Sequence, residues 1–163
     1  FDAGMYAALA MMGKVIFFAG SSVGFVLFPA VAKRTESGSG TAGLIYVSLG
    51  IVAVISIGLT GLYFIFPERA LGLLFGSSYI AAAKYLGLFG IFITFFSLSS
   101  VVSTALLGMG KTAGWKYILI AAGLQIVGIV WRHATISEIL ITNTVVCIAL
   151  TAALLLYYRH ERV

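Results

Sequence analysis

Charged side chains are scarce in this chain of 163 residues. They make up 9% of it, whereas roughly a quarter of a typical soluble protein is charged. Hydrophobic residues make up 61%, and the mean hydropathy is +1.12. Ten basic and five acidic side chains are too few to supply the polar part of the surface of a soluble fold of this size. The composition therefore excludes a soluble domain and a disordered chain, and it predicts an integral membrane protein.

Cysteine and recognised catalytic motifs are nearly absent as well. Cys147 is single, which excludes an internal disulfide and a cysteine-based metal site. His133 and His160 are far apart in the sequence, and the net charge of +5 is spread between apolar runs instead of forming a basic face. No phosphate-binding loop, serine-hydrolase elbow or zinc-protease motif occurs. We therefore expect no metal, no cofactor, no nucleic-acid partner and no enzymatic activity.

Five apolar stretches are long enough to cross a bilayer, which takes about 20 residues. They cover residues 3–31, 42–66, 80–108, 113–131 and 136–158. Helices are expected, because backbone groups in hydrocarbon must pair internally and because these runs exceed the strands of a membrane barrel. Residues 70–80 are too few to span, and they predict an interfacial or re-entrant segment. The sequence thus predicts one all-α bundle of five transmembrane helices over residues 1–163.

Basic residues are distributed unequally between the two sides that five spans define. One side holds six and the other three: Lys33, Arg34, Lys111, Lys116, Arg159 and Arg162 against Arg69, Lys84 and Arg132. The positive-inside rule makes the first side cytoplasmic, so the C-terminus is expected inside and Phe1 outside. A chain that starts outside, without Met or a signal, is expected to be a fragment that lacks N-terminal helices.

Lys14 is the strongest single feature within a span. It lies about eleven residues into the first stretch, which corresponds to a depth of roughly 16 Å. Its helix face includes Phe18 and Ser21. One interpretation is a cation that lines a path for an anionic or sugar-bearing headgroup, because a buried ammonium is costly and tends to face a cavity. The other is a snorkelling lysine that reaches the outer headgroups.

Small and polar residues recur along the spans at helical spacings. Glycines are expected to let helices approach closely, at Gly13, Gly20, Gly24, Gly87 and Gly90. Hydroxyl and amide side chains form further stripes: Thr94, Ser97, Ser100 and Thr104 in the third span, Gln125 in the fourth, and Asn143, Cys147 and Thr151 in the fifth. Hydrogen bonds between helices are the favoured role for the two amides, and substrate contact is the alternative. The candidate substrate path comprises Lys14, Tyr6, Ser21, Gln125 and Asn143.

Four short segments follow one another in a recognisable order. They are Ala3-Gly4-Met5-Tyr6-Ala7-Ala8, then Val26-Leu27-Phe28-Pro29, then Phe66-Pro67-Glu68 with Leu73-Leu74-Phe75-Gly76, and finally Leu106-Leu107-Gly108-Met109-Gly110-Lys111. This order resembles the oligosaccharide-flippase branch of the MATE-like exporter superfamily, over about the first 115 residues. Residues 129–137 depart from the family pattern, because they lack its Gly-Ala-Ala segment.

The resemblance implies twelve helices in two lobes, of which this chain would form helices eight to twelve of the C-terminal lobe. It further implies transport of a polyprenyl-diphosphate-linked sugar across the cytoplasmic membrane by alternating access, for polysaccharides such as the O-antigen of lipopolysaccharide. In the family, the helix that matches residues 3–31 lines the central cavity, and cationic side chains there meet the diphosphate. Lys14 lies on that helix. The implied partners are the bilayer, the lipid-linked sugar and the missing N-terminal lobe.

Three alternatives remain open at this point. A cation-coupled multidrug exporter of the MATE type would need a carboxylate in its cavity, and no Asp or Glu lies well inside any span of this chain. A membrane enzyme of glycan assembly would need a large outer loop with acidic and basic clusters, whereas the loops here are short. A purely structural membrane subunit is disfavoured by the intramembrane Lys14.

Overall fold

The computed structural model describes the backbone of residues 2–132 and 134–161, and the side chains of residues 4–132 and 134–160. Within them all regular structure is helical: α1 (Asp2–Glu36), α2 (Ala42–Ile65), α3 (Pro67–Phe75), η1 (Ser77–Ala82), α4 (Ala83–Gly108), η2 (Thr112–Gly114), α5 (Trp115–Trp131) and α6 (Ile136–Glu161). Five helical segments are long and apolar enough to cross a membrane: α1, α2, η1 with α4, η2 with α5, and α6. The predicted all-α architecture with five spans is confirmed, and the chain is a multi-pass membrane protein.

The first helix is longer than the sequence predicts. It continues through Pro29 as far as Glu36, five residues beyond the expected end. Val31 is fully buried in the core, so packing holds this last part of the helix in place. Lys33 and Arg34 stand in the last turn, where positive charge interacts favourably with the helix dipole. The connection between the first two predicted spans, residues 32–41, is therefore reduced to a short turn after Glu36.

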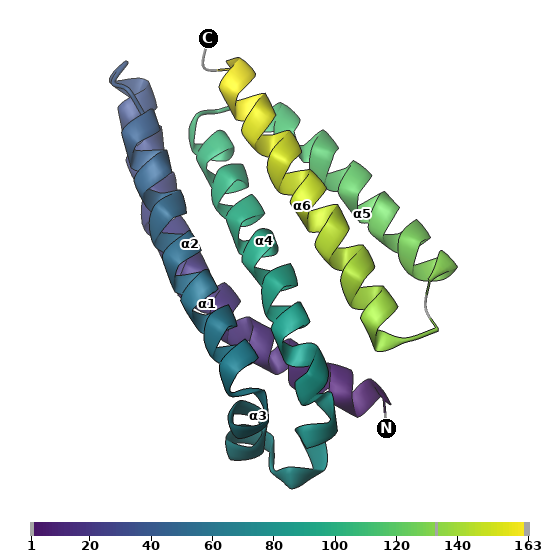
Figure 1. Cartoon of the computed structure of the whole chain (residues 1–163). Helices are drawn as coiled ribbons and strands as arrows, with labels where there is room; N and C mark the ends of the chain where they lie inside the picture. Colours follow the sequence, from purple (N-terminus) through teal and green to yellow (C-terminus); the bar gives the residue numbers. More distant parts are fainter. Residues whose placement is uncertain (1, 133, 162–163) are drawn as a thin grey trace.

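Helix α4 occupies the centre of the bundle (Figure 1). Helices α1 and α2 pack on one side of it and against each other, α6 packs on the other side, and α5 contacts α6 from the outside. Two apolar clusters form the core. One surrounds Leu9, Leu86 and Phe89 near α3, and the other surrounds Val31 and Leu154 towards the opposite end.

The segment between the second and third spans forms two short helices, α3 and η1, at one end of the bundle (Figure 1). Proline at the first position starts α3, and Gly76, with a φ of +83°, ends it. Leu71 is buried against the core, whereas Leu73 and Leu74 are exposed. Of the two predicted alternatives, this placement fits an interfacial segment.

The basic residues are concentrated in and near the turns at the two ends of the bundle. The α1–α2 turn, the α4–α5 turn and the last turn of α6 lie at one end, and the α2–α3 and α5–α6 connections lie at the other (Figure 1). The first end, called the basic end below, holds Lys33, Arg34, Lys111, Lys116 and Arg159. The other end holds Arg69, Lys84 and Arg132. Phe1, His133 and Arg162, which the predictions of orientation and metal binding used, lie outside the described residues.

Candidate functional site

Helices α1 and α4 approach each other closely through glycine. A Cβ at Gly13 would collide with the ring of Phe89, which is buried. At Gly20 it would lie 3.2 Å from Cγ1 of Val52 in α2 and 3.5 Å from Cβ of Ser97 in α4, so three helices meet there. Small residues allow this approach because helices in lipid associate through packing and gain little from a hydrophobic drive.

Helices α2 and α4 meet at two further glycines. A Cβ at Gly87 would lie 2.6 Å from Cε1 of Phe64, and one at Gly90 would lie 3.0 Å from Cγ2 of Thr60. Thr60 also shares a hydrogen bond with Thr94, with 3.0 Å between the two hydroxyl oxygens. The approach of α4 to α2 therefore combines glycine contacts with a buried hydroxyl pair.

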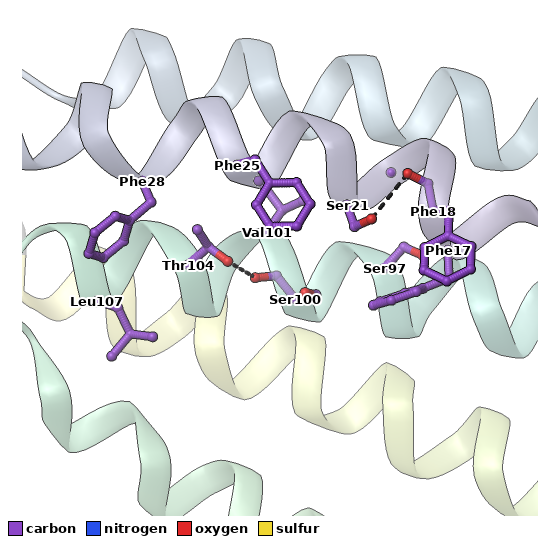
Figure 2. A pocket seen from close by; sticks show the side chains of 12 residues that line it. Phe17, Phe18, Ser21, Phe25, Phe28, Ser97, Ser100, Val101, Thr104 and Leu107 are labelled. Atoms are coloured by element: carbon purple, nitrogen blue, oxygen red, sulfur yellow. Dashed lines mark hydrogen bonds between the residues drawn. The ribbon is translucent and has the colours of Figure 1, made fainter. Parts of the chain in front are cut away.

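The contact between α1 and α4 loosens towards the basic end, where a groove opens. At Gly24 the nearest neighbour of a Cβ would be Oγ1 of Thr104, at 3.8 Å, which is an ordinary contact. The groove has a volume of about 520 Å³. It is lined by Phe17, Phe18, Gly20, Ser21, Gly24, Phe25 and Phe28 of α1 and by Ser97, Ser100, Val101, Thr104 and Leu107 of α4 (Figure 2).

The walls of this groove are mostly apolar, and two of its four hydroxyls bond within their own helices. Oγ of Ser97 is buried without a hydrogen-bond partner. Phe25 is 81% exposed along the rim. Oγ of Ser21 donates to the carbonyl of Phe18 at 3.1 Å, and Oγ1 of Thr104 donates to the carbonyl of Ser100 at 2.8 Å (Figure 2). With their hydroxyls satisfied by backbone carbonyls, these side chains leave a groove that suits hydrocarbon better than a hydrated group.

The groove is bounded at both ends. At its inner end the rings of Phe17 and Phe96 lie 5.5 Å apart. At the basic end, a Cβ at Gly108 would lie 3.1 Å from the carbonyl oxygen of Phe28, so α1 and α4 touch again. The eleven helical steps from Phe17 to Phe28 correspond to a length of about 16 Å.

Lys14 lies on the face of α1 that lines the groove, one helical turn beyond the inner end of the groove. The stripe of Lys14, Phe18 and Ser21 follows helical spacing, and the lysine is exposed. Among the described residues Lys14 has no ion-pair or hydrogen-bond partner. An unpaired cation thus stands where the apolar groove ends.

Lys14 lies level with the ends of α2 and α4 that are close to α3. Oη of Tyr63, two residues before α2 ends, donates to the carbonyl of Met12 at 2.9 Å. The adjacent Gly13 faces Phe89, which comes six residues, or about 9 Å, after α4 begins. The first part of α1 runs obliquely past α4 (Figure 1). At this level a lysine side chain can extend towards the headgroups while its stem stays beside the groove.

The structure brings together only some of the candidate path residues. Lys14 and Ser21 lie on the stripe that lines the groove. Tyr6 lies apart from it, half-buried, with its ring edge-on to Phe89 at a centroid distance of 5.9 Å. The sequence identified the hydroxyl stripe of α4 but missed Phe25 and its neighbours, although their spacing from Lys14 marks the same face of α1.

Gln125 and Asn143 lie on the opposite side of α4 from α1 and pair with each other. Nε2 of Gln125 donates to Oδ1 of Asn143 at 2.8 Å, and Asn143 is 3% exposed. Both residues stand nine positions from Ala134, near the connection of the α5–α6 hairpin, and residues equidistant from the connection meet in an antiparallel pair. That symmetry is the signal by which the sequence could have predicted the pair. The geometry assigns both amides to the α5–α6 interface and neither to the groove.

The other polar residues of α6 bond mainly to α4 or within α6. The hydroxyls of Ser99 and Thr151 share a hydrogen bond of 2.7 Å, and Thr151 also donates to the carbonyl of Phe95 at 3.1 Å. Cys147 is a buried free thiol. In the part of the chain that the structure describes, no three His, Cys, Asp or Glu residues gather in a way that could hold a metal ion.

Neither models of protein families, nor curated proteins, nor solved structures give a match to this chain.

Proposed function

We propose that this chain is part of a transporter that moves a lipid-linked oligosaccharide, on a polyprenyl diphosphate carrier, across the cytoplasmic membrane for cell-surface polysaccharide synthesis. The main support is the continuous stripe from Lys14 to Phe28, which joins a cation without an ion pair to an apolar groove. The fourteen helical steps from Lys14 to Phe28 correspond to about 21 Å, more than half of a hydrocarbon core of about 30 Å. A lipid that crosses from one leaflet to the other needs a cation for its anionic headgroup and an apolar surface for its hydrocarbon chain, and the stripe offers both.

In this proposal the residues of the stripe have separate roles. Lys14 attracts the anionic diphosphate, and Ser21 lies further along the same face, where it can meet the sugar. A second lobe of the same transporter completes the substrate path, and the side of the groove where Phe18 and Phe25 are exposed stays accessible to lipid. Gln125 and Asn143 contribute helix packing instead of substrate contact.

Replacing Lys14 by alanine tests the proposal. We expect glycan export by the protein that contains this chain to fall about fivefold in a complementation assay, because one basic side chain near a membrane surface attracts an anionic lipid group by about this factor. Lys14→Arg should retain export, and the control Lys84→Ala should too, because Lys84 stands over the ring of Tyr85 at the same end of the bundle. Unchanged export in Lys14→Ala at an equal membrane level would refute the role of Lys14.

We also propose that the basic end faces the cytoplasm. A cysteine at Ser39, in the exposed α1–α2 turn, should react in intact cells only with membrane-permeant thiol reagents. A matched cysteine at Ser78, exposed in η1 at the other end, should react with impermeant reagents as well. Cys147 is buried and should not contribute to the signal. Reaction of Ser39→Cys with an impermeant reagent would reverse the orientation.

A further inference from the structure

We infer that the groove between α1 and α4 holds one acyl chain of an anionic glycerophospholipid, whose phosphate lies at the basic end. This inference does not depend on the transport proposal, because it concerns a resident lipid of the bilayer and uses cations other than Lys14. Three observations carry it: the chemistry of the groove, its length and position, and the charge at its outer end.

The groove is open to hydrocarbon along its side. Phe18 is 61% exposed, Phe25 81% and Leu107 54%. The hydroxyls of Ser21 and Thr104 are bonded to backbone carbonyls of their own helices, so an apolar ligand leaves neither of them without a partner. A hydrocarbon chain is the ligand that such a groove accommodates without loss of hydrogen bonds.

The length of the groove matches one leaflet. It extends about 16 Å, and half of a hydrocarbon core of about 30 Å is about 15 Å. It also occupies the half of the bundle near the basic end: its α4 residues run from Ser97 to Leu107, and α4 ends at Gly108. An acyl chain of the leaflet at that end therefore reaches the inner limit of the groove at Phe17. A polyprenyl carrier chain is longer than one leaflet and would extend past this limit.

The charge at the outer end fits an anionic headgroup. Lys111 follows Leu107 by four residues in the α4–α5 turn, and Lys33 follows Phe28 by five residues in the last turn of α1. The described side chains at this end include five basic residues and one acidic residue, Glu36. Clustered basic residues next to a membrane span attract anionic lipids, so an anionic headgroup at the bilayer surface beside the basic end of the groove is favoured over a zwitterionic one.

Photo-crosslinking in nanodiscs of phosphatidylcholine tests this inference on the purified protein. A trace of phosphatidylglycerol with a photoreactive acyl chain should label the groove, at positions such as Phe25 and Leu107, about fivefold more than phosphatidylcholine with the same chain. Lys33→Ala and Lys111→Ala together should remove this preference. The control pair Lys84→Ala and Arg132→Ala, at the other end, should preserve it.

A second variant separates the groove from the general lipid layer. Gly24→Leu should fill the groove without displacing backbone, because its Cβ would meet only Oγ1 of Thr104 at 3.8 Å. Labelling of Phe25 and Leu107 should then fall to the level seen on the exposed face of α5, for example at Ile126, which is 65% exposed. Equal labelling by the two phospholipids, or labelling that Gly24→Leu leaves unchanged, would overturn the inference. Labelling by a polyprenyl phosphate probe without labelling by phosphatidylglycerol would also overturn it, and would support a substrate path. Loss of export in Lys14→Ala has no bearing on these results, so the two proposals can fail separately.

Discussion

Replacing Gly13 by valine should shift the unfolding equilibrium more than a hundredfold towards the unfolded state. The added side chain would enter the ring of Phe89, and Cγ1 of Ile93 would be only 2.9 Å from the new Cβ. Phe89 cannot move aside easily, because it is 3% exposed and its ring packs edge-on against those of Tyr6 and Phe92. Overpacking of this kind costs about 3 kcal/mol, and 1.4 kcal/mol corresponds to a factor of ten.

A matched glycine distinguishes this collision from a general effect of valine in a membrane helix. Gly58 lies within α2 and is exposed, and a Cβ added there would meet no atom of a neighbouring helix within 4 Å. Gly58→Val should therefore change the free energy of unfolding by less than about 1 kcal/mol. Both variants can be compared by denaturation in mixed micelles. Equal stability of the two variants would contradict the close approach of α1 and α4.

The number and type of the helices could be predicted because length and polarity suffice for a membrane span. A backbone in hydrocarbon has few alternatives to a helix, so five long apolar runs give five spans. The end of α1 could not be predicted in this way. Pro29 and the charged residues after it are typical of a helix end, yet Val31 packs against Gly108 and the helix continues to Glu36. That contact joins residues far apart in the sequence, so the local sequence around Pro29 does not reveal it.

The same distinction applies to the candidate site. Helical spacing placed Lys14, Phe18 and Ser21 on one face, because the periodicity of a single helix is a local property. The groove itself depends on which residues of α4 lie opposite that face and on where the two helices separate. Gly20 and Gly24 have similar sequence surroundings, but a Cβ added at Gly20 would lie 3.2 Å from Cγ1 of Val52, whereas one at Gly24 would have no neighbour closer than 3.8 Å. The register between helices decides this difference, and periodicity carries no information about it.

The pair of Gln125 and Asn143 gives the second large expected effect. Asn143→Leu should lower the free energy of unfolding by about 2 kcal/mol, or roughly thirtyfold in the equilibrium. The hydrogen bond alone would account for less, since such bonds between membrane helices average about 0.6 kcal/mol. The larger part arises because the amide of Gln125, half-buried between α5 and α6, loses its acceptor in apolar surroundings.

A control and a double variant make this prediction specific. Thr144 is also buried in α6, but its hydroxyl donates to the carbonyl of Leu140 in the same helix, so Thr144→Val should cost less than Asn143→Leu. Gln125→Leu with Asn143→Leu removes both amides and leaves no unpaired group. The double variant should therefore lose less stability than the sum of the two single variants in a double-mutant cycle. Strict additivity would mean that the two amides do not hold α5 to α6. Because α5 packs against α6 and otherwise mainly contacts its own short η2 turn, loss of this pair should loosen α5 first.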